Sequence, residues 1–292
     1  MNTAQKIIKY GAIAFAFFLI FSILSGIMVG VMLFSNIRQQ EEPNELKQTQ
    51  IENIPQKLKI NLISTKLEIR KSDSFSIETN HKIKIEENEN QLIIKETKNT
   101  FSNKNYYLVI NIPKNITFDE ISIDSGAGSI KIDSISAQKL DLDLGAGKLT
   151  AQNLTVLKQT KIEGGAGEIA IQNSSLSNLD LDLGVGNLDM TSEILGSSKI
   201  NAGVGKIKLS LLGSSTDYKI HLEKGIGSVQ IESNTIKEDS YYGTGDNQID
   251  IEGGIGDINV YYEKNKCFIY FFLAYYKYLN YNTYVKKESF YG

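Results

Sequence analysis

A short glycine motif recurs seven times along this chain and limits the folds that it can adopt. The tripeptide glycine–aliphatic–glycine begins at Gly126, Gly145, Gly165, Gly184, Gly203, Gly225 and Gly254, so that successive copies are 19, 20, 19, 19, 22 and 29 residues apart. A regular period of about 20 residues with one short apolar unit per period is typical of solenoid proteins, in which each repeat forms one coil. The sequence therefore predicts a repetitive architecture for residues 119–264.

Aligning the copies on the first glycine produces three columns that are apolar in every copy. They lie three residues before that glycine, four after it and six after it. The first column is Ile123, Leu142, Ile162, Leu181, Ile200, Leu222 and Ile251; the second is Ile130, Leu149, Ile169, Leu188, Ile207, Val229 and Ile258; the third is Ile132, Ala151, Ile171, Met190, Leu209, Ile231 and Val260. Alternation of apolar and polar residues indicates strands, and its change of parity across the second glycine indicates a bend. We expect an all-β fold, a parallel β-solenoid (β-helix-like) whose interior these columns line.

The residue between the two glycines changes along the chain from alanine to valine and then to isoleucine. Larger side chains fill more volume in a close-packed interior. This trend predicts that the interior widens at the glycine corner toward the C-terminal end, or that it faces smaller side chains there.

The regions before and after the repeat have different compositions. Residues 57–118 contain short alternating runs separated by turn residues such as those at 87–90, which predicts an N-terminal β-strand cap region. Residues 38–56 form a polar linker. The tail, 265–292, holds seven of the fifteen tyrosines and breaks every earlier pattern. Three interpretations of the tail stay open: a cap on the solenoid, a segment at a membrane interface, or sequence translated outside the ancestral reading frame.

An uncharged segment near the N-terminus predicts one transmembrane helix. Residues 11–37 carry no charged side chain, and a helix of about 20 apolar residues spans a bilayer. The segment is longer than the apolar core of a signal peptide and lacks a small-residue cleavage site. Lys6 and Lys9 precede it, so residues 1–37 are expected to form a cytoplasmic stub and a transmembrane helix, with the bulk of the chain outside the cytoplasm.

Composition argues against several classes of function. The single cysteine excludes an intramolecular disulfide. The presence of only two histidines argues against a metal site built from several histidines. Residues 38–264 contain 25 basic and 33 acidic residues, and such an acidic body is repelled by nucleic acid. The glycine motifs lack the spacing of nucleotide-binding loops, and no histidine accompanies a candidate nucleophile. We therefore predict no catalytic residues and no cofactor.

One outward column is nearly all acidic. Two residues before each first glycine stand Asp124, Asp143, Glu163, Asp182, Asn201, Glu223 and Glu252. Closely stacked like charges repel unless they are compensated. Three roles stay open: a solvated acidic face, a ladder that binds a hard cation such as calcium, and a ligand-recognition face. The compensating lysines are expected on neighbouring columns, at Lys131, Lys148, Lys206 and Lys208.

An insertion before the last copy offers a second candidate. Residues 232–248 include Tyr241 and Tyr242 beside two glycines. Loops on a rigid scaffold often carry recognition, and tyrosine is a good contact residue. The alternative is a bulged loop without a partner.

Repeats such as IDSGAGSIKI (123–132), LDLGAGKLTA (142–151) and IEGGAGEIAI (162–171) resemble a bacterial β-strand-repeat family of unknown function whose members are named as adhesins. The resemblance covers residues 57–264. It implies a short membrane-anchored envelope protein of a Gram-positive bacterium, and it brings no catalytic residues with it.

These observations predict a non-enzymatic adhesin or surface scaffold. It would be a single-pass protein of the cell membrane whose partner is an unknown protein or envelope ligand. The alternative is an accessory or sensory component of a cell-envelope stress response that binds a membrane partner or a wall-active compound. A polysaccharide lyase on a β-helix is disfavoured because residues 38–264 hold only two arginines, Arg38 and Arg70, and neither lies in the repeat.

Overall fold

The structure is a computed structural model that describes residues 47–88, 90–97, 106–232, 234–235 and 240–263. All of these residues belong to one compact unit of the chain. The predicted transmembrane segment 11–37, the first part of the linker and the tail 265–292 lie outside the described residues. Within the described ranges, no helix has the length and hydropathy needed to cross a membrane.

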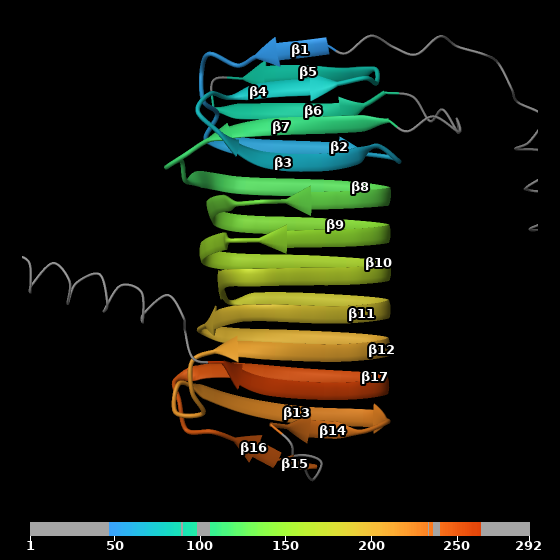
Figure 1. The fold of residues 1–292 in the computed structure, drawn as a ribbon, viewed down its shortest axis with the longest axis vertical. Helices are drawn as coiled ribbons and strands as arrows, with labels where there is room; N and C mark the ends of the chain where they lie inside the picture. The colour runs from blue at the N-terminus through green and yellow to red at the C-terminus, as the bar shows by residue number, and fades with distance from the viewer. Residues whose placement is uncertain (1–46, 89, 98–105, 233, 236–239, 264–292) are drawn as a thin grey trace, which may run out of the picture. The chain divides into compact units, whose positions relative to one another are not determined.

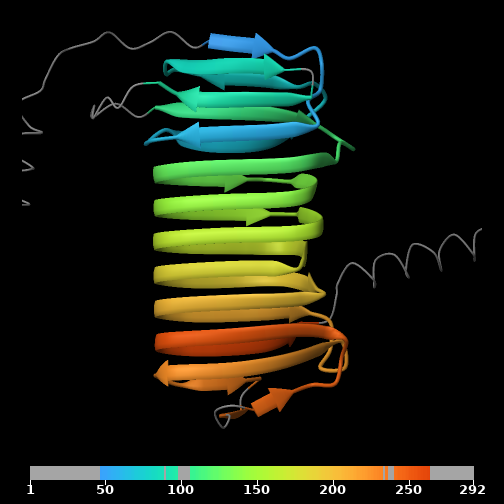
Figure 2. The same cartoon turned by 180° about the vertical axis from the view of Figure 1, so that it is seen from behind.

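The described residues form strands, so the prediction of an all-β fold is confirmed (Figures 1 and 2). The N-terminal strands are β1 (Lys47–Gln50), β2 (Lys57–Leu62), β3 (Lys66–Ser72), β4 (Ser76–Thr79), β5 (Ile83–Asn88), β6 (Gln91–Glu96) and β7 (Tyr107–Pro113). The repeat region contains β8 (Phe118–Ile132), β9 (Ile135–Gln152), β10 (Leu154–Ser177), β11 (Leu179–Leu195), β12 (Ser197–Leu212), β13 (Tyr218–Ile226), β14 (Val229–Ile231), β15 (Asn234–Thr235), β16 (Ser240–Tyr242) and β17 (Asn247–Glu263).

The repeats stack in parallel, one coil or rung on the next. Strands β8 to β12 pair in chain order, and each pairing sets equivalent repeat positions against each other, as in Ile162 against Leu181. All 21 residues of the three predicted apolar columns are buried; Ile231, at 8% exposed, is the least covered. Stacking supplies the apolar neighbours that a single rung lacks, so the columns form one continuous core.

Each rung bends at the second glycine of its motif, as the change of parity predicts. Gly186 has a φ of 152°, and a Cβ atom there would lie 1.8 Å from the carbonyl oxygen of Gly167 on the neighbouring rung. The other six second glycines likewise have φ between 132° and 150°. Only glycine combines this backbone conformation with such close contact between rungs.

The residue between the two glycines points outward, so the prediction that it fills the interior is wrong. Val185 is 55% exposed, Val204 44%, Ile255 53% and Ile226 73%. The bend places the flanking residues Leu183 and Leu188 inside and leaves the middle residue on the convex side of the corner. The increase in side-chain size therefore describes a surface and says nothing about interior volume.

The rungs leave chain order at the C-terminal end. Strand β17 lies between β12 and β13 and pairs in parallel with both, so the seventh motif stacks on the fifth and the sixth motif lies beyond it (Figure 1). After β12 the chain turns through residues 213–217, where the hydroxyl of the buried Tyr218 donates to the carbonyl of Leu212 at 2.7 Å. The turn places β13 one rung beyond β12, and β17 occupies the position between them.

One column of charged residues agrees with this order. Four residues before the first glycine, the column in spatial order reads Ser122, Asp141, Lys161, Asp180, Lys199, Asp250 and His221. With β17 inserted, Asp250 lies between Lys199 and His221, and its carboxylate is 3.5 Å from Nδ1 of His221. Stacking in chain order would place His221 directly beside Lys199 instead. Opposite charges on adjacent strands are favourable, so this column agrees with the observed order.

The N-terminal strands continue the stack beyond β8. Strands β2 and β3 pair in parallel with successive parts of β8, and β6 and β7 pair with β2 and β3 in turn. Strands β5 and β6 form the hairpin predicted around residues 87–90, while β4 joins β7 and β1 joins β4 in antiparallel pairs. This region covers the end of the core that β8 would otherwise expose.

A buried carboxylate fixes the turn between β2 and β3. Oε2 of Glu96 accepts hydrogen bonds from the N–H groups of Ile63, Ser64 and Thr65 at 2.7, 3.0 and 3.3 Å. Burial alone would raise the pKa of Glu96, but these donors more than offset burial and hold the pKa below its ordinary value. His81 lies beside it, with Nε2 3.3 Å from Oε1 of Glu96 and its ring stacked on Tyr106.

Candidate functional site

The acidic column predicted from the sequence exists as a continuous line on the outside of the stack. In spatial order it reads Asp124, Asp143, Glu163, Asp182, Asn201, Glu252 and Glu223, each set against the next by strand register. The residue before each member is buried, and because side chains alternate along a strand, the member itself points outward. This set is called the acidic column below.

The compensating lysines differ from those predicted. Lys161 lies 2.6 Å from Glu163 and Lys199 lies 3.0 Å from Glu252, and both lysines come from the column two residues earlier on the strand. Asn201 donates its side-chain amide to Asp182. The lysines expected in this role bind other acids: Lys131 binds Glu68 and Asp133, Lys148 binds Glu168, and Lys208 binds Asp189, while Lys206 lies near Asp257.

The N-terminal part of the acidic column has the least compensation. Partial burial raises the pKa of Asp143, and the neighbouring charges of Asp124, Glu163 and Asp141 raise it further. Lys161 offsets part of this effect. A raised carboxylate pKa beside other carboxylates marks this place as the one where a cationic group would gain most.

The cation-binding interpretation finds no geometry to support it. Across the part of the chain that the structure describes, no group of three or more histidine, cysteine, aspartate or glutamate side chains is arranged to hold a metal ion. Members of the acidic column are separated by the strand spacing of about 4.8 Å, and lysine or asparagine side chains already contact the carboxylates of Glu163, Glu252 and Asp182.

The tyrosines of the insertion divide into two roles. Tyr241 in β16 is 64% exposed, stacks on the ring of His221 at 4.7 Å and lies 4.9 Å from Nζ of Lys219. Tyr242 instead packs against the core. Of the two tyrosines in this insertion, Tyr241 is therefore the one whose ring is available for contact.

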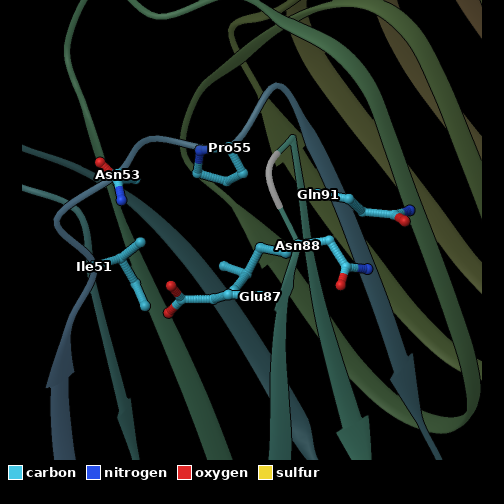
Figure 3. Close-up of a pocket in the computed structure, with 7 residues that line it drawn as sticks. Ile51, Asn53, Pro55, Glu87, Asn88 and Gln91 are labelled. Carbon is cyan, nitrogen blue, oxygen red and sulfur yellow. The ribbon is translucent and has the colours of Figure 1, made fainter.

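A small pocket lies in the N-terminal region, where sequence reasoning predicted none. Its volume is about 280 Å³, and it is lined by Ile51, Asn53, Pro55, Glu87, Asn88, Gln91 and Leu92. Figure 3 shows the segment between β1 and β2 on one side of it and the β5–β6 hairpin on the other. One carboxylate and three amides around an aliphatic floor provide hydrogen bonds but no nucleophile. The pocket is also smaller than most ligand sites, which range from about 300 to 1,000 Å³.

Comparison with known proteins identifies a matching family model and several similar structures. Residues 37–261 match the family model described as Toastrack DUF4097. Three solved structures are similar to this chain: a putative cell adhesion protein from Clostridium sporogenes (21% identity, 76% of this chain, 100% of that chain, TM-score 0.36), a putative adhesin from Bacteroides fragilis (12%, 74%, 97%, 0.45) and a putative lipid binding protein from Parabacteroides distasonis (18%, 76%, 97%, 0.34). No curated protein matches the chain.

Proposed function

Since this chain belongs to the Toastrack DUF4097 family, we propose that it is a membrane-anchored, extracytoplasmic surface protein that acts by binding and not by catalysis. The observation that carries the proposal is the separation of roles in each rung. The buried columns are apolar throughout and hold the stack together, while the acidic column presents six carboxylates, interrupted by Asn201, along the outside.

The anchor and the orientation rest on the sequence. The uncharged segment 11–37, with Lys6 and Lys9 before it, supports a single membrane helix with its N-terminus in the cytoplasm. Residues 38–46, the part of the predicted linker before β1, support a polar spacer between the stack and the bilayer. The rest of the predicted linker 38–56 belongs to the fold instead, because β1 pairs with β4 and Ile51 is buried in the core. The names of the similar structures agree with a surface role, but TM-scores below 0.5 give those names no weight.

The arrangement of polar groups supports a non-enzymatic role. His81 lies between β4 and β5, and His221 lies in β13, so the two histidines are at opposite ends of the stack (Figure 1). Each histidine has one carboxylate neighbour, but His81 and Glu96 are both buried, and Glu96 already accepts three backbone hydrogen bonds. A regular line of charges is instead suited to recognising an extended partner with complementary charge.

The test compares binding by three forms of the full-length chain, immobilised in detergent and exposed to fractions of the cell envelope. Replacing Asp143 and Asp182 by asparagine removes two charges from the acidic column, while Asp73→Asn with Glu52→Gln removes two charges from the N-terminal region. The wild type and the second variant should retain the same component. The first variant should lose about tenfold in affinity, or about 1.4 kcal/mol, at an unchanged melting temperature. Equal retention by all three forms would refute the acidic column as the binding face.

A further inference from the structure

Two rungs of the stack carry the residues that are needed to lie beside β12. Strand β17 occupies that place and sets its buried Ile251 against Ile200. Leu222 of β13 is buried at the same repeat position and meets Ile251 from the other side. Strand β14 likewise pairs with the second half of β17 in register. Because equivalent residues meet at every pairing, β13 and β14 would also fit directly on β12 with their apolar columns aligned.

The glycine corners of these two rungs are equivalent as well. Gly256 of β17 and Gly227, between β13 and β14, have φ of 146° and 150°. A Cβ atom at Gly256 would lie 1.6 Å from the carbonyl oxygen of Gly205 on β12, and a Cβ atom at Gly227 would lie 1.7 Å from the carbonyl oxygen of Gly256. Gly227 therefore already has the conformation that close stacking on Gly205 requires.

The connection between β12 and β13 is longer than those between the earlier rungs. The first glycines of the motifs from Gly126 to Gly203 are 19 or 20 residues apart, whereas Gly203 and Gly225 are 22 apart. Two or three extra residues span about 7–10 Å, which exceeds the roughly 4.8 Å that one further rung requires. The connection therefore reaches the observed position and also the nearer one, where the extra residues would bulge outward.

Asn247, the first residue of β17, fastens this strand to both neighbouring rungs. Its Oδ1 accepts a hydrogen bond from the N–H of Gly196 at 2.9 Å, and its Nδ2 donates to the carbonyl of Asp217 at 3.0 Å. The residue of β13 in register with Asn247 is the buried Tyr218, whose side chain has no amide to make this pair of bonds. Asn247 therefore favours β17 over β13 beside β12.

The observed order also covers the last rung. Because β17 returns to the place beside β12, the chain between β14 and β17 crosses the outer edge of the last rung, where β16 pairs with β13 and β15 pairs with β14, both antiparallel (Figure 1). Stacking in chain order would make β17 the last rung, with neither of these strands on its outer edge. Unpaired strand edges invite pairing with other chains, so the observed order is favoured in the complete chain.

We propose that β13 and β17 compete for the position beside β12, and that the chain has a second arrangement in which β13 holds it. In the complete chain, Asn247 and the cover formed by β15 and β16 keep β17 in place. When β17 cannot seat, β13 and β14 move toward β12 by one rung and close the stack. The C-terminal end is thus a two-state element, and release of β17 changes it without unfolding the earlier rungs.

Disulfide trapping in the full-length chain in detergent distinguishes the two arrangements. All variants carry Cys267→Ser, which removes the native thiol. Lys199→Cys with Asp250→Cys reports β17 beside β12, because these residues are paired neighbours. Lys199→Cys with His221→Cys reports β13 in that place, because His221 is the equivalent of Asp250 on β13. With β17 seated, the 199–250 disulfide should form at least about tenfold faster than the 199–221 disulfide.

Gly256→Ala unseats β17, because the new Cβ meets the carbonyl oxygen of Gly205. In this variant the 199–221 disulfide should become the faster of the two. Gly227→Ala is the matched control: it places the same clash on the rung that β13 and β14 form, so the 199–250 disulfide should stay the faster one. Ile251→Asp with Ile258→Asp unseats β17 independently, by placing two charges in the core. If neither β17 variant accelerated the 199–221 disulfide, the competition would be refuted.

A reference pair shows whether the earlier rungs stay folded. Lys161→Cys with Asp180→Cys joins β10 to β11 and should form its disulfide in every variant. Loss of this disulfide whenever β17 is unseated would show that the stack does not persist without β17, and would overturn the two-state element. The 199–221 disulfide must also lie within one chain. Covalent dimers in its place would show pairing between copies and would contradict the proposal.

Discussion

Replacing Gly186 by alanine should destabilise the stack far more than an ordinary glycine-to-alanine change in a strand. Its φ of 152° lies outside the conformations that alanine readily adopts, which costs about 1–3 kcal/mol. The new Cβ would lie 1.8 Å from the carbonyl oxygen of Gly167 and 2.8 Å from its carbon, both backbone atoms that cannot rotate away. The two rungs must separate at the corner, and each inter-rung hydrogen bond lost adds about 1 kcal/mol.

The total expected loss is therefore about 3–5 kcal/mol, a large part of the 5–15 kcal/mol that typically stabilises a domain. In a domain of this size, such a loss lowers the melting temperature by about 10 °C or more. Gly164 in the same region is the matched control, because its φ is ordinary and the nearest atom to a new Cβ is the flexible Cδ1 of Leu183 at 2.9 Å. Thermal melting followed by far-ultraviolet circular dichroism measures both variants. If Gly186→Ala and Gly164→Ala melted together, the glycine corner would not be under the constraint described here.

Three further predictions concern the core, the order of the rungs and the buried carboxylate. Leu181→Asp places an unpaired charge in a fully buried column and should cost several kcal/mol in denaturant titration, whereas Leu157→Asp at an exposed position should cost little; equal losses would show that the column is not interior. In a Cys267→Ser chain, cysteines at 199 and 250 should form a disulfide, because those residues are paired neighbours, whereas cysteines at 199 and 221 should not; the reverse result would restore chain order. Because the folded-state pKa of Glu96 lies below its unfolded value of about 4.3, its charge stabilises the fold above that pH and less so as the pH falls through the folded pKa. Glu96→Gln should therefore lower the melting temperature at neutral pH and flatten its decline below about pH 4, and an unchanged acid profile would contradict the role assigned to Glu96.

The core and the corner were predictable from the sequence because repetition averages out local ambiguity. A single apolar residue such as Ile200 does not show by itself whether its side chain is buried. Seven apolar residues at the same repeat position are most simply explained by a column that lines the interior. The bend at Gly186 followed from the change of parity around it. Both features depend on local periodicity, and the same pattern occurs in all seven repeats.

The order of the last rungs was not predictable from the apolar columns, because every rung offers the same ones. Strand β13 and strand β17 fit equally well on β12 by hydrophobic matching. One difference between them is electrostatic: Asp250 of β17 lies in register between Lys199 and His221 and contacts His221, whereas Glu252, the acidic partner of Lys199, has an equivalent in Glu223 of β13. That alternation is visible in the sequence once the column four residues before the glycine is written out.

The orientation of Val185 and its equivalents was mistaken for a related reason. Hydrophobic character and a regular increase in size suggested burial, yet at a bend the side chain on the convex side points outward whatever its polarity. The partners of the acidic column were also misassigned, because the lysines that contact it come from the column two positions earlier, either on the same strand or on the neighbouring one. Lys161 beside Glu163 is an example.

Protease treatment of intact, wall-stripped cells tests the central claim most directly, namely that the stack is displayed outside the cytoplasm on an N-terminal anchor. The measurement follows residues 57–264 with an antibody against this region, beside a cytoplasmic control protein. The proposed topology predicts that the region is lost at protease concentrations that leave the cytoplasmic protein intact, and that a fragment containing residues 11–37 stays with the membrane. Protection of residues 57–264 until the cells are lysed would contradict the orientation and, with it, the proposed function as a surface protein.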